Sequence, residues 1–96
     1  MNTPIFFFRT SREVQNHLAA VLRQRRRARK HSRQEAAKVS GVPAPTIRRF
    51  ETRGEISLRQ FLMLCAFYGD LKHAEGLFPE PGPATMDELL ATHDKA

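Results

Sequence analysis

Residues 32–50, SRQEAAKVSGVPAPTIRRF, decide the fold that we expect for this chain. The Ser-x-x-Glu spacing at its start is that of a capping box, which predicts that a helix begins directly after Ser32. Gly41 follows as a turn residue, because a glycine tolerates positive φ. A second helix then begins near Pro43 or Ala44, since proline is acceptable in a first helical turn. The stretch therefore predicts two short helices joined by a tight turn, the pattern of a helix-turn-helix.

The second of these helices has two different faces. Helical periodicity directs Ile47, Phe50 and Glu51 toward one side. The opposite side carries Pro45, Arg48, Arg49 and Thr52. In a helix-turn-helix this outward face enters the major groove of DNA, where arginine recognises guanine with two hydrogen bonds. The predicted base-contacting residues are Arg49, secondarily Arg48, and for apolar contact Ala44 and Pro45. The alternative for both arginines is contact with phosphates only.

A run of basic residues precedes and enters the first helix of the motif. Seven Lys and Arg residues fall between positions 23 and 33, a density that attracts phosphates. Ser32 and Arg33 are expected to lie against the DNA backbone at the start of that helix. The remaining predicted phosphate contacts are Thr46, Arg29, Lys30 and Arg53. Taken alone, such a run is also typical of a solvated face or of a nonspecific RNA or membrane patch.

A longer helix is predicted ahead of the motif. The Thr10-x-x-Glu13 spacing is a second capping box, so this helix is expected to run from there to about Lys30. Its apolar residues Val14, Leu18, Val21 and Leu22 are predicted to share one buried face. The inner face of the next helix is predicted to hold Ala36, Ala37 and Val39.

The chain after the motif predicts further helices. Ser57 and Gln60 have the spacing of a third capping box, and the helix that ends at Gly69 is the most apolar in the chain and the expected core helix. A short fifth helix is expected over residues 71–78, with Leu71, Ala74, Leu77 and Phe78 available for packing. Residues 79–83 are rich in proline, and a final short helix is expected from residue 85 onward.

The N-terminal residues 1–9 have a different character. The apolar run Ile5, Phe6, Phe7 and Phe8 is too short for a membrane span and predicts a short strand or extended arm. A lone strand favours pairing with a second subunit or a partner's sheet edge, and the alternative is an arm folded over its own core. The expected organisation is therefore an arm over 1–9, an all-α five-helix domain over 10–78, and a linker with a short helix over 79–96.

Composition narrows the class of protein. Ninety-six residues with 41% apolar content suit one small domain. The net charge of +6 is uneven, because residues 1–69 hold 14 Lys and Arg against 4 Asp and Glu, while residues 70–96 hold 2 against 6. The single Cys65 cannot form an internal disulfide, and no signal-peptide pattern opens the chain. We expect a cytoplasmic protein whose basic end binds a polyanion.

The residues give little support for catalysis. His17, His31, His73 and His93 lack metal-ligand spacing, and Cys65 lies in an apolar segment. No glycine-rich phosphate loop follows a strand. The sequence therefore predicts neither an enzyme nor a bound metal or cofactor.

From Ser32 to Arg53 the chain resembles the Xre/Cro/C1-type helix-turn-helix family. The matching residues are Ser32, Glu35, Ala37, Gly41, Val42, Thr46, Ile47, Arg49 and Glu51. The resemblance extends from about Leu18 to Leu77 and implies a five-helix, lambda-repressor-like DNA-binding domain. It also implies that Arg26, late in the first helix, pairs with Glu51. Four residues depart from the family pattern: Arg33 in place of the usual Gln, Ala36 in place of the usual Leu, His31 in place of a common Leu, and Pro43 in place of the usual Ser or Thr cap.

Within that family, TIRRFE followed by SLRQFLMLCAFYG is similar to HipB-type antitoxins, which repress their own operon and bind a kinase toxin. The leading expectation is a homodimeric repressor on a palindromic operator, because two recognition helices multiply specificity. This repressor is also expected to be the antitoxin of a toxin–antitoxin operon, with a kinase-type toxin gripped by the aromatic arm and the acidic C-terminal tail. One alternative is a stand-alone Xre-type repressor without a toxin partner. Another is RNA binding through the arginine-rich helix.

Overall fold

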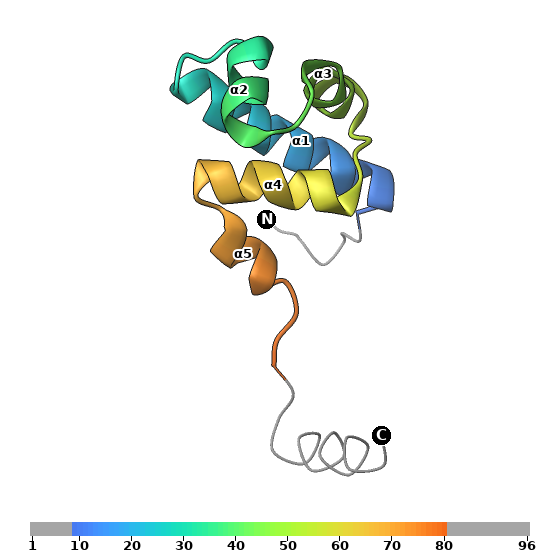
Figure 1. Ribbon diagram of the computed structural model, residues 1–96. Helices are drawn as coiled ribbons and strands as arrows, with labels where there is room; N and C mark the ends of the chain where they lie inside the picture. Colours follow the sequence, from blue (N-terminus) through green and yellow to red (C-terminus); the bar gives the residue numbers. More distant parts are fainter. Residues whose placement is uncertain (1–8, 81–96) are drawn as a thin grey trace, which may run out of the picture.

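The computed structural model describes residues 9–80, which form five helices and no strand (Figure 1). The helices are α1 (Ser11–Ala28), α2 (Arg33–Ser40), α3 (Ala44–Arg53), α4 (Leu58–Tyr68) and α5 (Leu71–Glu75). The predicted all-α, five-helix fold class is therefore confirmed. The expected arm with Ile5, Phe6, Phe7 and Phe8 and the expected helix from residue 85 lie outside the described residues.

The starts of α1 and α2 follow from local sequence. The Thr10 hydroxyl accepts the Glu13 N–H at 3.1 Å, and the Glu13 carboxylate accepts the Thr10 N–H at 2.8 Å. Ser32 and Glu35 make the same reciprocal pair at 3.0 and 2.7 Å. Each capping box satisfies two N–H groups that lack partners within the helix. Both predicted boxes are present.

The third predicted capping box forms only in part. The Ser57 hydroxyl oxygen accepts the Gln60 N–H at 3.1 Å, which caps α4 as expected. The Gln60 side-chain oxygen, however, lies 3.1 Å from the same hydroxyl, from which it accepts a hydrogen bond. An amide oxygen accepts equally well from a hydroxyl, so the residue types alone did not decide its partner.

Two helices end earlier than predicted. The first ends at Ala28 and not at about Lys30, because Lys30 has a left-handed φ of 59° that turns the chain toward α2. The fifth ends at Glu75 and not at Phe78, with Gly76 as its C-cap. These boundaries depend on where the chain must turn, which a periodicity does not record.

The buried core is formed by α1 to α4 and the turn between α2 and α3. Its apolar members are Ala19, Leu22, Ala36, Val42, Ile47, Phe50, Leu64, Cys65 and Tyr68. The buried face of α1 is Ala19, Leu22 and Arg26. The predicted face was wrong for Val14 and Leu18, which are 42% and 38% exposed. The side of α1 that packs against α3 and α4 includes the small residue Ala19. Val14 and Leu18 lie away from this side and are therefore exposed.

Other expected core positions also lie at the surface. Val39 is 50% exposed, while Val42, beyond the turn, is fully buried as expected. In and after α5, Leu71, Leu77 and Phe78 are exposed, and α5 itself buries no residue. A helix of five residues makes a single turn and presents only one short face to α4.

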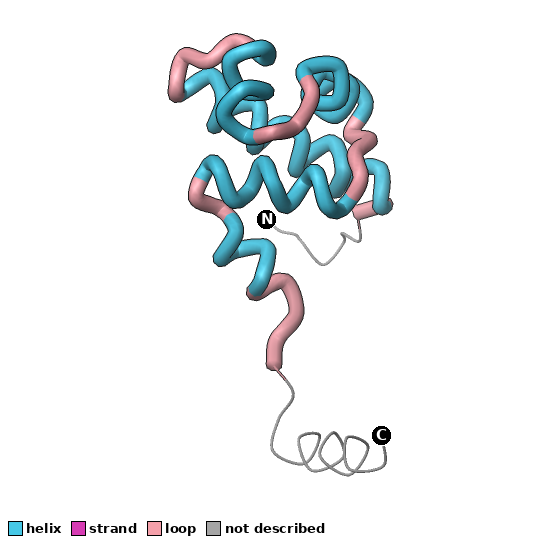
Figure 2. Tube along the Cα trace, in the orientation of Figure 1, coloured by secondary structure: helices cyan, strands magenta, loops and turns pink. Residues whose placement is uncertain are grey.

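The arrangement separates two sides of the domain. Figure 1 shows α2 and α3 on one side of α1 and α4, with α5 on the other. Short loops join the helices along the chain (Figure 2). Among the helices of residues 9–80, none has the length and apolar character needed to cross a membrane. The α2 and α3 side carries the motif that the sequence singled out.

Candidate nucleic-acid interface

The turn between α2 and α3 is held by local hydrogen bonds to a backbone carbonyl and to a side-chain hydroxyl. Gly41 has φ 83°, and its N–H donates to the Ala37 carbonyl at 2.9 Å. The Val42 N–H donates to the Ser40 hydroxyl oxygen at 3.1 Å, and the Val42 side chain is buried. Pro43 precedes α3 without a side-chain cap, as its departure from the family pattern suggested. The turn therefore fixes the angle between the two helices.

The outer side of α3 forms one wall of an open groove of about 950 Å³. The groove is lined by Arg33, Gln34, Ala44, Pro45, Arg48, Arg49, Thr52 and Arg53. The four predicted base-contacting residues thus lie together, beside two of the predicted phosphate contacts. Guanidinium groups at this density suit the edges of guanine and the surrounding phosphates.

Arg49 makes a contact that the sequence did not suggest. Its Nε donates to Glu55 Oε1 at 3.0 Å, and the two side chains are 64% and 41% exposed. Glu55 follows the left-handed Gly54 at the end of α3, which returns the chain past the helix. A guanidinium bound through Nε still has its terminal nitrogens for two parallel hydrogen bonds. Glu55 can therefore orient Arg49.

The inner side of α3 carries a shared ion pair. Arg26 contacts Glu51 through Nε at 2.7 Å and Nη2 at 2.9 Å, and its Nη1 donates to the His31 carbonyl at 2.8 Å. Arg33 donates from Nε to Glu51 Oε1 at 2.9 Å, and Arg23 lies 4.0 Å from the same oxygen. We call these residues the Glu51 cluster. It joins α1, α2 and α3 through a carboxylate that is 3% exposed.

The charges of the Glu51 cluster do not cancel. Burial by itself raises the pKa of the Glu51 carboxyl, but the hydrogen bonds from Arg26 and Arg33 outweigh burial and hold it below its ordinary value. The hydrogen bond to Glu51 likewise raises the pKa of Arg26. One carboxylate therefore stays ionised among three guanidinium groups, Arg23 included. The cluster keeps a positive excess on the side of α2 and α3.

The predicted phosphate contacts fall into different places. Arg33 and Arg53 line the groove beside α3. Thr46 lines a separate hollow with Arg49 and Glu55. Arg29 packs against α4, with its guanidinium carbon 4.7 Å from the centre of the Phe67 ring.

The start of α2 presents further donors and one acid. Lys30 is exposed. The Ser32 hydroxyl and N–H are both engaged with Glu35. The backbone hydrogen bond from Ser32 is the main cause of the lowered pKa of Glu35, so a carboxylate already occupies part of this helix start.

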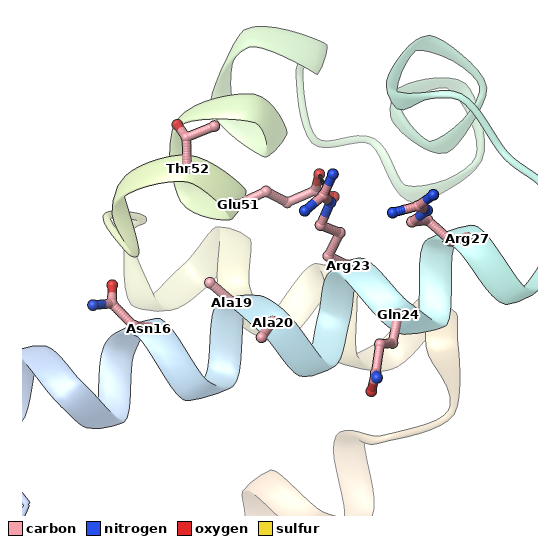
Figure 3. A pocket seen from close by; sticks show the side chains of 8 residues that line it. All are labelled: Asn16, Ala19, Ala20, Arg23, Gln24, Arg27, Glu51 and Thr52. Atoms are coloured by element: carbon pink, nitrogen blue, oxygen red, sulfur yellow. Dashed lines mark ion pairs between the residues drawn. The ribbon is translucent and has the colours of Figure 1, made fainter.

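Sequence reasoning missed a second basic groove. It lies between α1 and α3, has a volume of about 360 Å³, and is lined by Asn16, Ala19, Ala20, Arg23, Gln24, Arg27, Glu51 and Thr52 (Figure 3). Arg23 and Arg27 are one turn apart on α1, a spacing that the basic run contained. That spacing gained meaning only once α3 was placed beside α1.

Metal-binding groups are not gathered at this surface. In the portion of the chain from residue 9 to residue 80, no three His, Cys, Asp or Glu side chains are grouped to hold a metal ion. The side chains that line the two grooves are instead mostly cationic or neutral. They suit an anionic ligand with many oxygen acceptors.

Comparison with known proteins agrees with this geometry. Residues 17–70, more than half of the chain, match the family model described as a helix-turn-helix domain. The match begins within α1 and ends directly before α5. No curated protein and no solved structure matches the chain.

Proposed function

The chain belongs to the helix-turn-helix family, and from that premise we propose that it is a sequence-specific, DNA-binding transcriptional repressor of the Xre type. The observation that supports this most is the groove beside α3, which Arg48 and Arg49 line together with Arg33 and Arg53. In this proposal α3 enters the major groove, and Arg49 reads a guanine. Arg33 and Arg53 hold the flanking phosphates.

The rigidity of the interface supports base reading over loose attachment. The Glu51 cluster fixes α3 against α1 and α2, and Glu55 holds the Nε of Arg49. A guanidinium that is already oriented loses less conformational freedom when it meets a base edge. Nonspecific attachment would not require this arrangement, because phosphates accept hydrogen bonds from many directions.

The test compares specific with nonspecific DNA. A duplex site is first selected from a random library with the native protein, and affinity for this site and for a scrambled duplex is measured by fluorescence anisotropy. Arg49→Ala is expected to weaken the binding free energy by about 1–3 kcal/mol for the selected site and by much less for the scrambled duplex. Arg59→Ala, on α4, is the control for a lost positive charge. Equal losses on both duplexes would reduce Arg49 to a phosphate contact.

We further propose that the repressor acts as a homodimer on a palindromic site. One α3 reads only a few base pairs, and two-fold pairing doubles the sequence that is read. Selected sites should then contain two inverted half-sites about one helical turn apart. Light scattering of the full chain measures its mass directly. A monomer that selects single, asymmetric sites would contradict this part of the proposal.

A second candidate adds a toxin partner, which would make the repressor an antitoxin. It is favoured by an apolar groove of about 260 Å³ between α1, α4 and α5, on the side away from α3. Leu77 beside it is 67% exposed and Phe78 is 82% exposed. Co-purification with the product of an adjacent gene, and loss of that complex in Leu77→Asp, tests this candidate. A solitary gene would argue for the repressor alone.

A further inference from the structure

The groove between α1 and α3 is lined by polar and cationic side chains, although packing of the two helices would require only apolar ones. A helix contact is ordinarily filled by apolar side chains, yet this one opens into a space lined by Asn16, Arg23, Arg27 and Thr52 (Figure 3). Ala20 also lines it and is exposed, so a small side chain keeps the space open. The groove therefore presents cations and neutral hydrogen-bonding groups to a ligand from solvent.

The positive charge in this groove is largely uncompensated. Figure 3 shows Arg23 extending toward Glu51. However, the carboxylate of Glu51 already binds Arg26 and Arg33 at 2.7–2.9 Å, whereas Arg23 Nε is 4.0 Å away and its side chain is 49% exposed. Among the residues from 9 to 80, no ion pair forms with Arg27. Two guanidinium groups one helical turn apart thus face solvent with little neutralisation.

Hydrogen bonds join the two helices that form this groove, and the groove adjoins the one beside α3. Arg12 Nη1 donates to the Arg53 carbonyl at 2.6 Å, and Gln15 Nε2 donates to the Gly54 carbonyl at 3.0 Å, so α1 holds the end of α3. Thr52 lines both this groove and the one beside α3. The two grooves therefore meet along the exposed edge of α3.

We propose that the α1/α3 groove is a second phosphodiester-binding site, in which Arg23 and Arg27 hold backbone phosphates of the duplex beyond the bases that α3 faces. The inference rests on the proposed function, because it extends the same DNA interface onto α1. Phosphate oxygens accept from guanidinium groups, and the Asn16 amide supplies a further donor at the groove wall, whereas the Thr52 hydroxyl donates to the Arg48 carbonyl at 2.8 Å. The site adds affinity and orientation without reading sequence.

The salt dependence of binding measures the number of phosphates contacted. The observed association constant falls with salt, and each neutralised phosphate of B-form DNA adds about 0.9 to the slope of the double-logarithmic plot. Arg23→Ala/Arg27→Ala is therefore expected to lower that slope by about 2, on selected and scrambled duplexes alike. Arg23→Lys/Arg27→Lys keeps both charges and is expected to retain the slope. Arg59→Ala/Lys72→Ala, on α4 and α5, removes two charges elsewhere and should leave the slope unchanged.

A charge inserted into the groove gives an independent variant. Ala20→Glu places a carboxylate in the groove one helical turn before Arg23 and should weaken binding, whereas Ala20→Gln adds the same bulk without charge and should weaken it much less. Ala20 is exposed, so both variants are expected to fold, and thermal melts check this. If Ala20→Gln weakens binding as much as Ala20→Glu, the effect is steric and the phosphate site is overturned.

The outcomes separate this inference from the function on which it rests. If Arg49→Ala loses the selected site while Arg23→Ala/Arg27→Ala keeps the native slope, the repressor proposal stands and the α1/α3 site is overturned. If the native protein binds no duplex DNA, both are overturned. Both proposals are supported by a third outcome. In it, Arg23→Ala/Arg27→Ala lowers the salt-dependence slope, and Arg49→Ala reduces the preference for the selected site over the scrambled duplex.

Discussion

The end of α3 and the end of α4 are held to their neighbouring helices in different ways. Where α3 ends, the chain lies against α1: Gly54 is buried, and its carbonyl and that of Arg53 accept hydrogen bonds from Gln15 and Arg12. Where α4 ends, Gly69 is exposed and α5 buries no residue. The first junction includes a buried ion pair, whereas the second has Arg25 and Asp70 in contact at 3.0 Å, with Arg25 45% exposed.

This difference indicates what the fold holds most firmly. We call the two places the α1/α3 junction and the α4/α5 junction. Contacts that cost much to break are concentrated where α3 must keep its position, because a shift of that helix would misalign Arg48 and Arg49 together. The α4/α5 junction carries less of the stability and lies away from α3. Substitutions at the two junctions should therefore differ in size.

The largest effect is expected from the Glu51 cluster. Glu51→Gln leaves Arg26 buried without its counter-charge, and removing one partner of a buried pair costs about 3–5 kcal/mol. Chemical denaturation measures the free energy of unfolding. Glu55→Gln, which touches an exposed pair on the same helix end, is the matched control and should cost far less.

A double-mutant cycle sharpens this result. Arg26→Gln and Glu51→Gln are each expected to destabilise, and the double variant should lose less than the two losses added together, because it leaves no lone buried charge. Additive losses would contradict a direct contact between the two side chains. The α1/α3 junction would then depend on packing alone.

Matched glycine substitutions test the junctions next. Gly54 has φ 72°, and a Cβ atom there would lie 2.9 Å from Asn16 Oδ1 and 3.3 Å from the backbone carbon of Gln15. Gly69 has φ 80°, but nothing lies within 4 Å of its Cβ position. Gly69→Ala should cost about 1 kcal/mol for the left-handed backbone alone, and Gly54→Ala about 2–3 kcal/mol because the contact is added.

Thermal melts of both glycine variants provide the measurement. Their backbone strain is alike, so the difference between them reports the close approach of α1 to the end of α3. Equal destabilisation would mean that Asn16 moves aside freely and that the α1/α3 junction is less tight than its distances suggest.

A smaller effect is expected from acid. The folded pKa of Glu51 is depressed, so its contribution to stability is complete above the ordinary glutamate pKa of about 4.3 and is lost as the pH falls below it. Unfolding measured between about pH 6 and pH 3 should show stability falling at the acid end. Glu51→Gln should flatten this dependence more than Asp70→Asn, although the hydrogen bond from Arg25 also lowers the pKa of Asp70. If both substitutions reduced the pH dependence of stability equally, the α1/α3 junction would not be the more stabilising of the two.

The smallest effect is expected from Arg25→Ala at the α4/α5 junction. Its guanidinium is largely solvated, and water and salt screen its attraction to Asp70. The melting temperature should therefore change less than in Gly69→Ala. A loss that approaches that of Glu51→Gln would show that α5 is anchored as firmly as α3.

Local signals predicted more of the fold than long-range ones. The starts of α1 and α2 were predictable because Thr10 and Ser32 interact with residues three positions away. The turn at Gly41 was also predictable from a local signal, because a glycine tolerates the positive φ that the turn requires. The buried sides of α1 and α2 were predictable only in part. Leu22 and Ala36 are buried as expected, whereas Val14 and Val39 would suit a core but are exposed because of how the other helices pack.

The candidate interface was predictable to a similar degree. The direction of Arg48 and Arg49 follows from helical periodicity once α3 is assigned. The contact of Arg49 with Glu55 was not predictable, because it depends on the left-handed return of the chain at Gly54. The groove with Arg23 and Arg27 was hidden for another reason, since it exists only between two helices that are distant in sequence.

The burial of Cys65 has a practical consequence for following motion in the native chain. Its thiol lines the groove between α1, α4 and α5, and burial raises its pKa, so little reactive thiolate is present near neutral pH. Because the sequence contains no other cysteine, alkylation occurs at one site without any engineering. The rate at which an iodoacetamide reagent labels the folded protein therefore reports how often this buried thiol becomes accessible, as it would if α5 moved away from α1 and α4.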